Sequence, residues 1–457
     1  MIICLALQSW MLGPFTKPAQ VNPVIAPNPG VAWEAYATFN PAAVVKDGKV
    51  FLLYRAEDTS GVQQIGGHTS RLGLAESGDG LHFTRRANPV LYPDSDAQRQ
   101  NEWPGGVEDP RIVQAEDGSY ILTYTQWNRD VPRLAVATSR DLIAWTKHGP
   151  AFAHAAGGKY LRTESKSGAI LARVEGDRIV ATRVNGKYWM YFGVPELRIA
   201  TSDNLLDWTP LEDREGKAIA VLTARPDHFD SWLVEAGPPA MLTDRGILVL
   251  YNAGSLPSRS YSAGQALFDA HDPTKLIARS DSAFIKPTES YERTGQYTAG
   301  TTFVEGLVPF KGRWFLYYGT ADSRVGVAVQ GTRSPADLIV GTWHGTSLCA
   351  DKQVDGACHD EEVIYVIDSA AGPRGPARWQ ADKIVNGARD PMGTLLLTFD
   401  STAGNWFSDI NTRVRARFTL TVRGDSIVGD LRDLPSQRLV RRLAVGRCTT
   451  RIPQCPK

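Results

Sequence analysis

The sequence of 457 residues has no excess of charge of either sign, since 50 Lys and Arg residues stand against 49 Asp and Glu residues. A chain without a basic surface lacks the electrostatic attraction on which nucleic-acid and anionic-membrane binding depend. Neither partner is therefore expected. The sequence also has no Cys-x-x-Cys pair among its 5 cysteines, and His359 alone accompanies the first close pair. A zinc site is disfavoured, and no metal or other cofactor is expected.

Long apolar runs are also missing. The longest, at the N-terminus, is roughly a dozen residues, too short to span a bilayer, and no basic segment precedes it. Residues 1–30 are predicted to be a leader or extension: the remnant of a signal sequence or, equally, a first strand that covers the body. The first interpretation predicts a periplasmic or secreted protein, and the second leaves the cytoplasm as the alternative.

The cysteines bear on the same question. Cys4 lies in the apolar leader, whereas Cys349 with Cys358, and Cys448 with Cys455, form two closely spaced pairs. Two local disulfides would indicate an oxidising compartment, and the alternative is free buried thiols in a cytosolic enzyme.

Helical periodicity is nearly absent before residue 330, and a repeated phrase takes its place: an apolar strand, a tight Gly-containing turn and an aromatic-rich strand. Its five copies lie at 40–58, 108–127, 167–194, 236–254 and 300–322. Most copies are followed by a second hairpin, as at 72–86, 134–149 and 197–211. Four strands per repeat predict an all-β fold with a five-bladed β-propeller over 31–335. An open sandwich of hairpins is the alternative.

The pattern changes after residue 338. Residues 340–457 read as antiparallel strands rich in Thr, Val and Phe, with Gly-Asp turns and no copy of the repeat. They are predicted to form a small C-terminal antiparallel β domain, a sandwich or a barrel, closed by the cysteine pairs.

Polar residues gather where the repeats begin and end, and the first strands of propeller blades converge on a central funnel. The residues expected there are Asn40, Arg55, Asp58, Arg71, Glu108, Asp109, Glu164, Lys166, Glu235, Glu305 and Asp322. Converging carboxylates repel one another, so the arrangement is costly unless it serves a reaction. Cleavage of a glycosidic bond needs two carboxyl groups, one that protonates the leaving oxygen and one that activates the attacking group. A propeller that binds glycans without cutting them would show the same funnel.

The strings FNPAAVV, YRAED, SRLGLAES, GVEDPRI, SKSGAI, AGPPAML and YYGTADSRVGVA, in this order between about 35 and 330, resemble glycoside hydrolase family 130. That family contains inverting mannoside phosphorylases and β-mannosidases on a five-bladed propeller. The resemblance implies that Asp109 is the general acid, acting partly through a sugar hydroxyl that relays the proton. It implies that Asn40, Arg55, Asp58, Arg71 and Asp322 bind mannose. Glu108 is expected to orient the sugar or to pair with Arg111.

The resemblance is compatible with two reactions, phosphorolysis and hydrolysis. Phosphate as the attacking group needs cations around it, whereas water needs a carboxylate base. Phosphorylases of the family usually place a His where this sequence has Asn252, and one cation, Lys166, remains. Glu164 and Glu235 lie where hydrolytic members place their candidate bases, and Glu305 adds a third acid.

The prediction is an inverting hydrolase of β-mannosides, β-1,2- or β-1,4-linked manno-oligosaccharides, with Asp109 as acid and Glu164 or Glu235 as base. A phosphorylase that releases mannose 1-phosphate, with inorganic phosphate as co-substrate, is the alternative. The expected partner is a small oligosaccharide, and homo-oligomerisation stays open.

Overall fold

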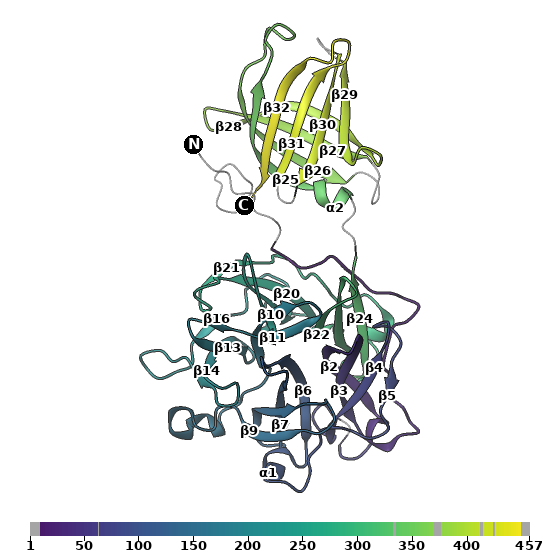
Figure 1. Ribbon diagram of the computed structural model, residues 1–457, viewed down its shortest axis with the longest axis vertical. Helices are drawn as coiled ribbons and strands as arrows, with labels where there is room; N and C mark the ends of the chain where they lie inside the picture. The colour runs from purple at the N-terminus through teal and green to yellow at the C-terminus, as the bar shows by residue number, and fades with distance from the viewer. Residues whose placement is uncertain are drawn as a thin grey trace. The chain divides into compact units, whose positions relative to one another are not determined.

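The computed structural model describes residues 10–62, 64–331, 335–369, 376–411, 415–423 and 426–448. The chain is all-β, as predicted (Figure 1). Its helices are short: η1 (Ala32–Glu34), α1 (Arg99–Glu102), η2 (Ala155–Arg162), η3 (Ser290–Glu292) and α2 (Pro335–Ile339). Among the described residues, none of these helices has the length and apolar character needed to cross a membrane. The chain divides into two compact units, residues 11–331 and residues 332–457 with 1–10.

The first unit is built from five successive groups of antiparallel strands, one for each copy of the sequence repeat. The first group contains β2 (Ala37–Lys46), β3 (Lys49–Glu57), β4 (Ser70–Ser77) and β5 (Thr84–Arg85). The second contains β6 (Gly106–Gln114), β7 (Tyr120–Trp127), β8 (Pro132–Ser139) and β9 (Thr146–Pro150). In both groups each strand pairs with the next along the chain.

The third and fourth groups follow the same order with extra short strands. The third contains β10 (Ala169–Glu175), β11 (Arg178–Ala181), β12 (Arg183–Val184), β13 (Lys187–Phe192), β14 (Leu197–Ser202), β15 (Thr209–Pro210) and β16 (Ala220–Leu222). The fourth contains β17 (Leu233–Ala236), β18 (Ala240–Thr243), β19 (Gly246–Gly254), β20 (Tyr261–Phe268) and β21 (Leu276–Arg279).

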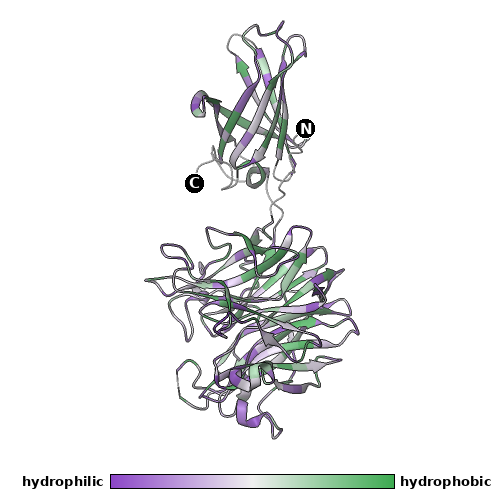
Figure 2. Cartoon of the chain, turned by 90° about the vertical axis from the view of Figure 1, so that its left-hand side faces the viewer, coloured by the Kyte–Doolittle hydropathy of each residue, from purple (hydrophilic) through white to green (hydrophobic). Residues whose placement is uncertain are grey.

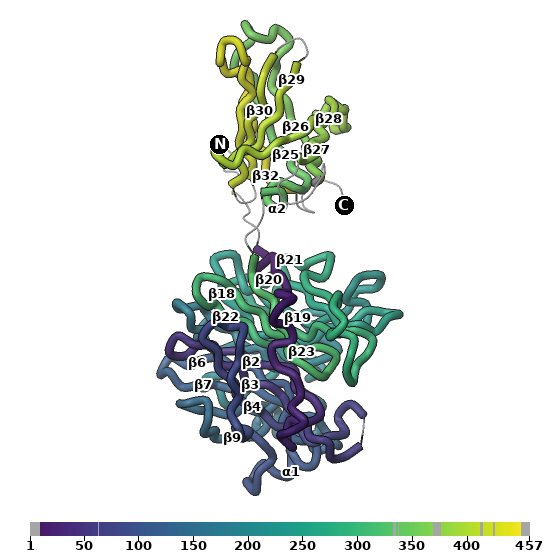
Figure 3. Tube along the Cα trace, turned by 90° about the vertical axis from the view of Figure 1, so that its right-hand side faces the viewer, coloured from purple at the N-terminus to yellow at the C-terminus, as the bar shows by residue number. Residues whose placement is uncertain are grey.

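The fifth group combines both ends of the unit. It contains β22 (Phe303–Phe310), β23 (Arg313–Thr320) and β24 (Arg324–Gln330), and its fourth strand is β1 (Phe15–Thr16). Strand β1 pairs antiparallel with β24, with Phe15 opposite Gln330. Figure 3 shows the N-terminal segment, in purple, running along the outside of the unit. The N-terminal extension therefore supplies a strand to this unit from Phe15 onwards.

The core of the first unit lies between neighbouring groups. One apolar cluster joins the first and second groups, for example Val44 with Ile112, and a second cluster joins the second and third groups, for example Val113 with Ile170. Two further clusters join the third with the fourth group and the fifth with the first. Hydropathic colouring shows apolar residues concentrated on the strands (Figure 2). At these four interfaces, neighbouring groups thus bury apolar side chains against each other, which removes them from water and stabilises the stacking.

Four of the groups share a buried polar contact. A tyrosine hydroxyl of the central strands donates to a carboxylate that precedes the group: Tyr54 to Glu34 at 2.7 Å, and Tyr124 to Glu102, Tyr251 to Asp230 and Tyr318 to Glu292 at 2.9 Å. A cation from the group's outer strand, or next to it, pairs with the same carboxylate: Arg85 with Glu34, Lys147 with Glu102, Arg279 with Asp230 and Lys17 with Glu292. Each contact ties the outer edge of a group to its centre.

The second unit contains a closed barrel of eight antiparallel strands (Figure 1). They are β25 (Gly341–Cys349), β26 (Glu361–Ser369), β27 (Ala377–Val385), β28 (Ala388–Asp400), β29 (Asn405–Asn411), β30 (Arg415–Arg423), β31 (Ser426–Asp433) and β32 (Leu439–Arg447). Strand β25 pairs with β26 and with β32, which closes the barrel. Of the two predicted forms, sandwich or barrel, the structure contains the barrel. Its apolar core includes Trp343, Trp379 and Trp406.

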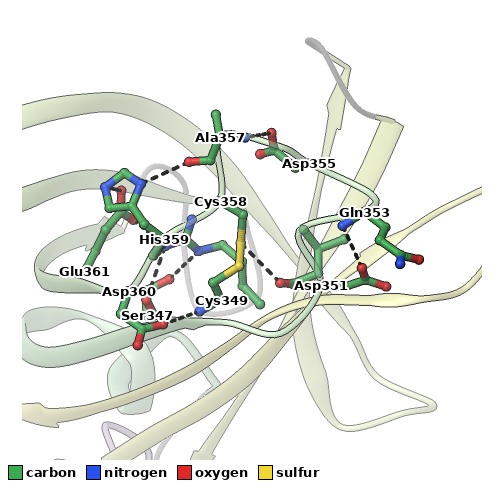
Figure 4. The surroundings of a disulfide bond; sticks show 12 residues. Ser347, Cys349, Asp351, Gln353, Asp355, Ala357, Cys358, His359, Asp360 and Glu361 are labelled. Atoms are coloured by element: carbon green, nitrogen blue, oxygen red, sulfur yellow. Dashed lines mark hydrogen bonds and ion pairs between the residues drawn. A yellow bond between two sulfur atoms is a disulfide. The ribbon is translucent and has the colours of Figure 1, made fainter.

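The predicted disulfide between Cys349 and Cys358 is present (Figure 4). It closes the loop between β25 and β26, and the backbone N–H of Cys349 also donates to Asp360 at 2.8 Å. Cys4 and Cys455 lie outside the described residues, so the predicted pairing of Cys448 with Cys455 stays a prediction.

Candidate active site

A cavity of about 170 Å³ in the first unit gathers polar side chains from the first, second, fourth and fifth strand groups and, with Lys166, from the segment that precedes the third. Four of them are carboxyl groups, namely Glu57, Asp109, Glu235 and Asp322. The cations among the lining residues are Arg55 and Lys166, and Asn40 adds an amide. Because the groups contribute to one cavity, residues far apart in the sequence become neighbours there.

Bulges near the start of the first strand place key residues of three groups. Strand register shifts at Asn40 in β2, at Asp109 in β6 and at Glu305 in β22. A bulge leaves one residue unpaired and redirects its side chain. Asn40 and Asp109 have positive φ angles of 45° and 49°, a conformation that Asn and Asp tolerate better than most residues. The local chain geometry therefore turns these two side chains out of the ladder and into the cavity.

The paired glycines before Glu108 permit close packing. A Cβ atom at Gly105 would collide with the ring of Trp127, and one at Gly106 would collide with the backbone of Ser70. Ser70 pairs with Gly106 in parallel, which joins β4 of the first group to β6 of the second. The two glycines thus hold the second group close to the first at the point where Asp109 enters the cavity.

Arg55 organises the carboxylates of the first two groups. Its Nη2 lies 2.7 Å from Glu57 and 2.8 Å from Glu108, and its Nη1 lies 3.1 Å from Asp109. Its Nε donates to the hydroxyl of Ser70 at 3.0 Å. The sequence allowed Glu108 to pair with Arg111, but the structure pairs Glu108 with Arg55 instead. A guanidinium presents its donors in a fixed plane, so one side chain fixes three acids.

The adjacent acids Glu108 and Asp109 differ in their affinity for protons. Burial raises the pKa of Glu108 above its ordinary value in spite of the nearby Arg55. Burial also acts on Asp109, but Arg55, Lys166 and Arg111 together with the hydrogen bond from Asn40 hold its pKa below the ordinary value. That bond, from Asn40 Nδ2 to Asp109 Oδ1, measures 2.8 Å. In this structure Asp109 therefore favours the carboxylate form.

Asp322 behaves in the opposite way. Burial raises its pKa to about 7, and Asp109 and Glu57 add to the shift while Arg55 opposes it. Gln296 lies beside it, because its Nε2 donates to the Asp322 backbone oxygen at 2.9 Å and to Glu57 at 2.8 Å. The cavity thus holds one carboxyl that keeps its proton close to neutral pH.

Glu235 and Lys166 form the opposite part of the cavity. Glu235 lies at 4% exposure in β17 and accepts a short hydrogen bond from the hydroxyl of Ser167. Burial alone would lower the pKa of Lys166, but the negative charges of Glu235, Asp109 and Glu108 raise it. Lys166 is therefore a cation stabilised by the charges of Glu235 and Asp109, and all three residues line this cavity.

Besides Asp58, four of the predicted acids and amides do not line the cavity, namely Glu108, Glu164, Asn252 and Glu305. Glu164 is exposed in the segment before β10. Asn252 bridges two groups, since its Nδ2 donates to the Val304 carbonyl at 3.1 Å and its Oδ1 accepts from the Val304 amide at 2.7 Å. Glu305 is fully buried, and its Oε1 lies 2.9 Å from Arg111 Nη1 in an ion pair without hydrogen-bond alignment. Burial raises the pKa of Glu305 well above its ordinary value.

Asp58 and Arg71 pair with each other at 2.7 Å and do not line the cavity, so their predicted contact with sugar stays a prediction. Glu57, which the sequence analysis did not select, lines the cavity. Alternation in β3 could have found it, because residues two apart share one face of a strand, and Arg55 and Glu57 are two apart. The structure adds Tyr261, Gln296 and Thr301, for which no motif gave a signal.

Two aromatic residues differ in their relation to the cavity. Tyr297 lines the cavity and packs edge-on against Tyr261, with ring centroids 5.5 Å apart. Trp103 is 48% exposed and lies over Arg99. In the described part of the chain, no cluster of three or more His, Cys, Asp or Glu side chains has an arrangement suited to a metal ion.

Comparison with known proteins gives a family match over most of the chain. The model of glycoside hydrolase family 130, described as β-1,4-mannooligosaccharide phosphorylase, matches residues 21–338. A 1,2-β-oligomannan phosphorylase from Thermoanaerobacter sp. (strain X514) is 32% identical over 312 residues, which cover 67% of this chain and 94% of the relative.

Solved structures are more similar still. A glycosyl hydrolase from Bacteroides ovatus is 51% identical, with a TM-score of 0.70, over 72% of this chain and 97% of that one. A second solved structure is 50% identical with the same TM-score and coverage. Its description states that the family 130 mannoside phosphorylases contain glycoside hydrolases that target β-1,2-mannosidic linkages in Candida mannan. A β-1,2-mannobiose phosphorylase from Listeria innocua shares the fold at 22% identity and a TM-score of 0.57.

Proposed function

Because this chain belongs to glycoside hydrolase family 130, we propose that it hydrolyses β-1,2- or β-1,4-mannosidic bonds in small manno-oligosaccharides, with inversion at the anomeric carbon. Two structural relatives at 50–51% identity support hydrolysis: one is named as a glycosyl hydrolase, and the other is described with family 130 glycoside hydrolases that target β-1,2-mannosidic linkages. We further propose that the five strand groups are the blades of a five-bladed propeller, closed where β1 completes the fifth group. The apolar clusters between neighbouring groups support this arrangement.

The charge of the cavity carries the proposal of hydrolysis. Four carboxyl groups line it, against two cations. Phosphate brings about two negative charges and requires free Arg, Lys or His donors. Arg55 is already bound to Glu57, Glu108 and Asp109, and Lys166 is subject to the negative charges of Glu235 and Asp109. A phosphate ion would therefore meet acceptor oxygens whose negative charge repels it, whereas a water molecule would meet a base.

We assign Glu235 as that base in preference to Glu164. Glu235 lines the cavity and accepts a hydrogen bond from Ser167, whereas Glu164 is exposed outside it. Glu235 would take a proton from water as the water oxygen attacks the anomeric carbon. The bond from that carbon to the leaving oxygen breaks at the same time, and the leaving oxygen takes a proton from the acid.

Asp109 is assigned as the acid, and its proton has to arrive with the substrate. At rest it accepts hydrogen bonds from Asn40 and Arg55, which favour its ionised form. Asp322 lines the same cavity and retains a proton close to neutral pH. We propose Asp322 as the source of the proton for Asp109, and Asp109 would pass its proton to the leaving oxygen through a sugar hydroxyl, which is the relay that the family resemblance implies.

Phosphorolysis remains the second candidate because the curated relatives at 30–32% identity are named as phosphorylases. The deciding experiment incubates the chain with β-1,2- and β-1,4-mannobiose, with and without inorganic phosphate, and identifies the products by NMR. Hydrolysis predicts two mannose molecules at the same rate in either buffer, with the new anomeric centre initially α. Mannose 1-phosphate formed only with phosphate would overturn the proposal.

The same assay includes Asp109→Asn as a control for the catalytic assignment. Loss of a general acid costs roughly 10²–10⁴ in rate, so we expect at least about a 100-fold lower kcat with the fold retained. A wild-type chain that binds mannobiose without cleaving it would favour a glycan-binding role.

The location is proposed to be periplasmic or extracellular. The Cys349–Cys358 disulfide supports it, because such bonds persist in oxidising compartments. A hydrolase also suits that location, since free mannose can be imported after cleavage.

A further inference from the structure

Arg111 is a buried cation of the same Glu-Asp-Pro-Arg string as Asp109, and the proposed reaction gives it no part. It is 1% exposed, in β6, and its guanidinium makes three hydrogen bonds to backbone carbonyls. Nη1 donates to the Asp109 carbonyl at 2.9 Å, Nη2 to the Ala236 carbonyl at 2.8 Å and Nε to the Gly237 carbonyl at 3.1 Å.

These carbonyls belong to the chain segments that carry the proposed acid and base. One is the carbonyl of Asp109 itself, in the second group. The other two follow Glu235 directly, in the fourth group. The two segments are more than 120 residues apart in sequence, as the separation of 126 between Arg111 and Gly237 shows. One rigid, planar guanidinium therefore connects the backbone of the acid to the backbone of the base.

A third group holds the guanidinium in place. Glu305 in β22 is fully buried, and its Oε1 lies 2.9 Å from Arg111 Nη1. Replacing a buried ion pair by apolar residues is often neutral or stabilising, so stability alone does not account for this pair. The contacts of Arg111 instead fix the relative positions of three chain segments, those of Asp109, Glu235 and Glu305.

We infer that Arg111 is a positioning residue that sets the separation between Asp109 and Glu235, and that Glu305 fixes the orientation of Arg111. The inference rests on the proposed function. In an inverting glycosidase the two carboxyl groups must leave room for a water molecule, at roughly 6.5–9.5 Å. A misplacement of about 1 Å can cost about 100-fold in rate. Neither Arg111 nor Glu305 lines the cavity, so both act through the residues that do.

The test compares two substrates that depend differently on the acid. β-1,2-Mannobiose has a poor leaving group and needs protonation, whereas 2,4-dinitrophenyl β-mannoside has a leaving group that departs without it. The variant Arg111→Lys keeps the charge but loses the planar guanidinium with its several donors. We expect its kcat to fall about 100-fold for mannobiose and about 10-fold for the aryl mannoside. KM should change less than about threefold. The ratio of the two rates would thus shift about tenfold.

A purely structural role gives a different result. Partial unfolding lowers the concentration of active protein and reduces both rates by the same factor, leaving the ratio unchanged. Arg279→Lys is the matched control, because Arg279 donates to the Tyr251 hydroxyl at 3.0 Å and to the Thr223 carbonyl at 2.7 Å and pairs with Asp230. It lies outside the cavity lining, so its substitution should lower the melting temperature without moving the ratio.

Glu305→Gln provides the second variant if Arg111→Lys fails to fold. It keeps the shape of the side chain and replaces one carboxyl oxygen with an amide NH2 group, which cannot accept from Arg111, and we expect a ratio shift of about threefold in the same direction. Equal losses on both substrates in the folded variants would overturn the positioning role. Wild-type activity that requires phosphate would overturn hydrolysis alone, because the ratio could then be measured with phosphate as the attacking group. A wild-type chain that cleaves mannobiose neither with nor without phosphate would overturn both the proposed function and the positioning role.

Discussion

Single residues in the cavity carry charge at a cost to stability. Asp322 has an ordinary pKa of 3.8 and a pKa of about 7 in the fold, because burial disfavours its charged form. Asp58, outside the lining, shows the opposite shift: burial would raise its pKa, but hydrogen bonds from Ser60 and Arg71 lower it. The two aspartates therefore have opposite effects on how the stability of the fold depends on pH.

This difference predicts opposite effects of two matched substitutions. Between pH 3.8 and about 7 the unfolded chain releases the Asp322 proton and the folded chain retains it, so stability falls as pH rises through this window. Asp322→Asn removes that loss, and we expect a melting temperature about 2–4 °C above wild type at pH 8, with little change at pH 4. Activity should fall, because Asp322 lines the cavity.

Asp58→Asn is the comparison. The lowered pKa of Asp58 contributes stability that is present above its ordinary pKa and lost as pH falls through the lowered value. Its replacement should therefore reduce the melting temperature at pH 8. Thermal melts of both variants from pH 4 to pH 8 check the prediction, and a pH-independent Asp322→Asn difference would contradict it.

At the scale of single residues, the sequence predicts most of the charged residues of the cavity but not every position. Asn40, Arg55, Asp109, Lys166, Glu235 and Asp322 all line the cavity. The choice of Asp58 over Glu57 followed the family resemblance, although strand alternation places Glu57 beside Arg55. Glu164 and Glu235 looked equivalent because each precedes a repeat phrase, and only the fold distinguishes an exposed segment from a buried strand.

At the scale of elements, the recurring feature is the tyrosine–carboxylate–cation contact. In the first, second and fourth groups the cation lies in the group's own last strand, as Arg85, Lys147 and Arg279 do. In the fifth group it is Lys17, next to β1, at 2.5 Å from Glu292. Lys17 therefore supplies to the fifth group the cation that the last strand supplies in the other three. The N-terminal segment is thus part of the repeat.

This role predicts a stability loss on replacing Lys17. Its partner Glu292 is fully buried, and an uncompensated buried charge costs on the order of 3 kcal/mol. We expect Lys17→Met to lower the melting temperature of the first unit by about 5 °C or more. Lys49→Met is the control, because Lys49 and its partner Glu76 are both largely exposed and such pairs contribute about 0–1 kcal/mol.

Equal, small shifts for both lysine variants in differential scanning calorimetry would refute a structural role of the Lys17 contact. The hairpin turns make the five repeats visible in the sequence, whereas residues 1–30 show no such pattern. The reason is physical: β1 is only two residues long, and two residues are too few to show strand alternation.

At the scale of the whole molecule, the two units should respond separately to reduction. The Cys349–Cys358 bond closes a loop within the second unit, where the sequence separation is 9. A loop of this size gives roughly 2–3 kcal/mol in the chain-entropy account. Reducing agent should therefore lower the melting transition of the barrel by several degrees while mannobiose hydrolysis continues at an unchanged rate.

Calorimetry and the product assay on the same reduced sample check this expectation. A loss of hydrolysis on reduction at a temperature where both units stay folded would contradict it. The sequence predicted that residues 340–457 form antiparallel strands but left barrel and sandwich open. Local strand patterns are the same in both, and only the long-range pairing of β25 with β32 decides between them.

The pairing of β1 with β24 also has a consequence for how the protein is made. Thr16 and Val329 are neighbours in the fold but 313 residues apart in the chain. At a synthesis rate of roughly 5–20 residues per second, β1 leaves the ribosome on the order of 15–60 s before its partner does. During that time the nascent chain carries an unpaired strand and the lysine that Glu292 requires. The proposed propeller can therefore close only after its last strand has emerged, so its final assembly has to wait for synthesis to reach that strand.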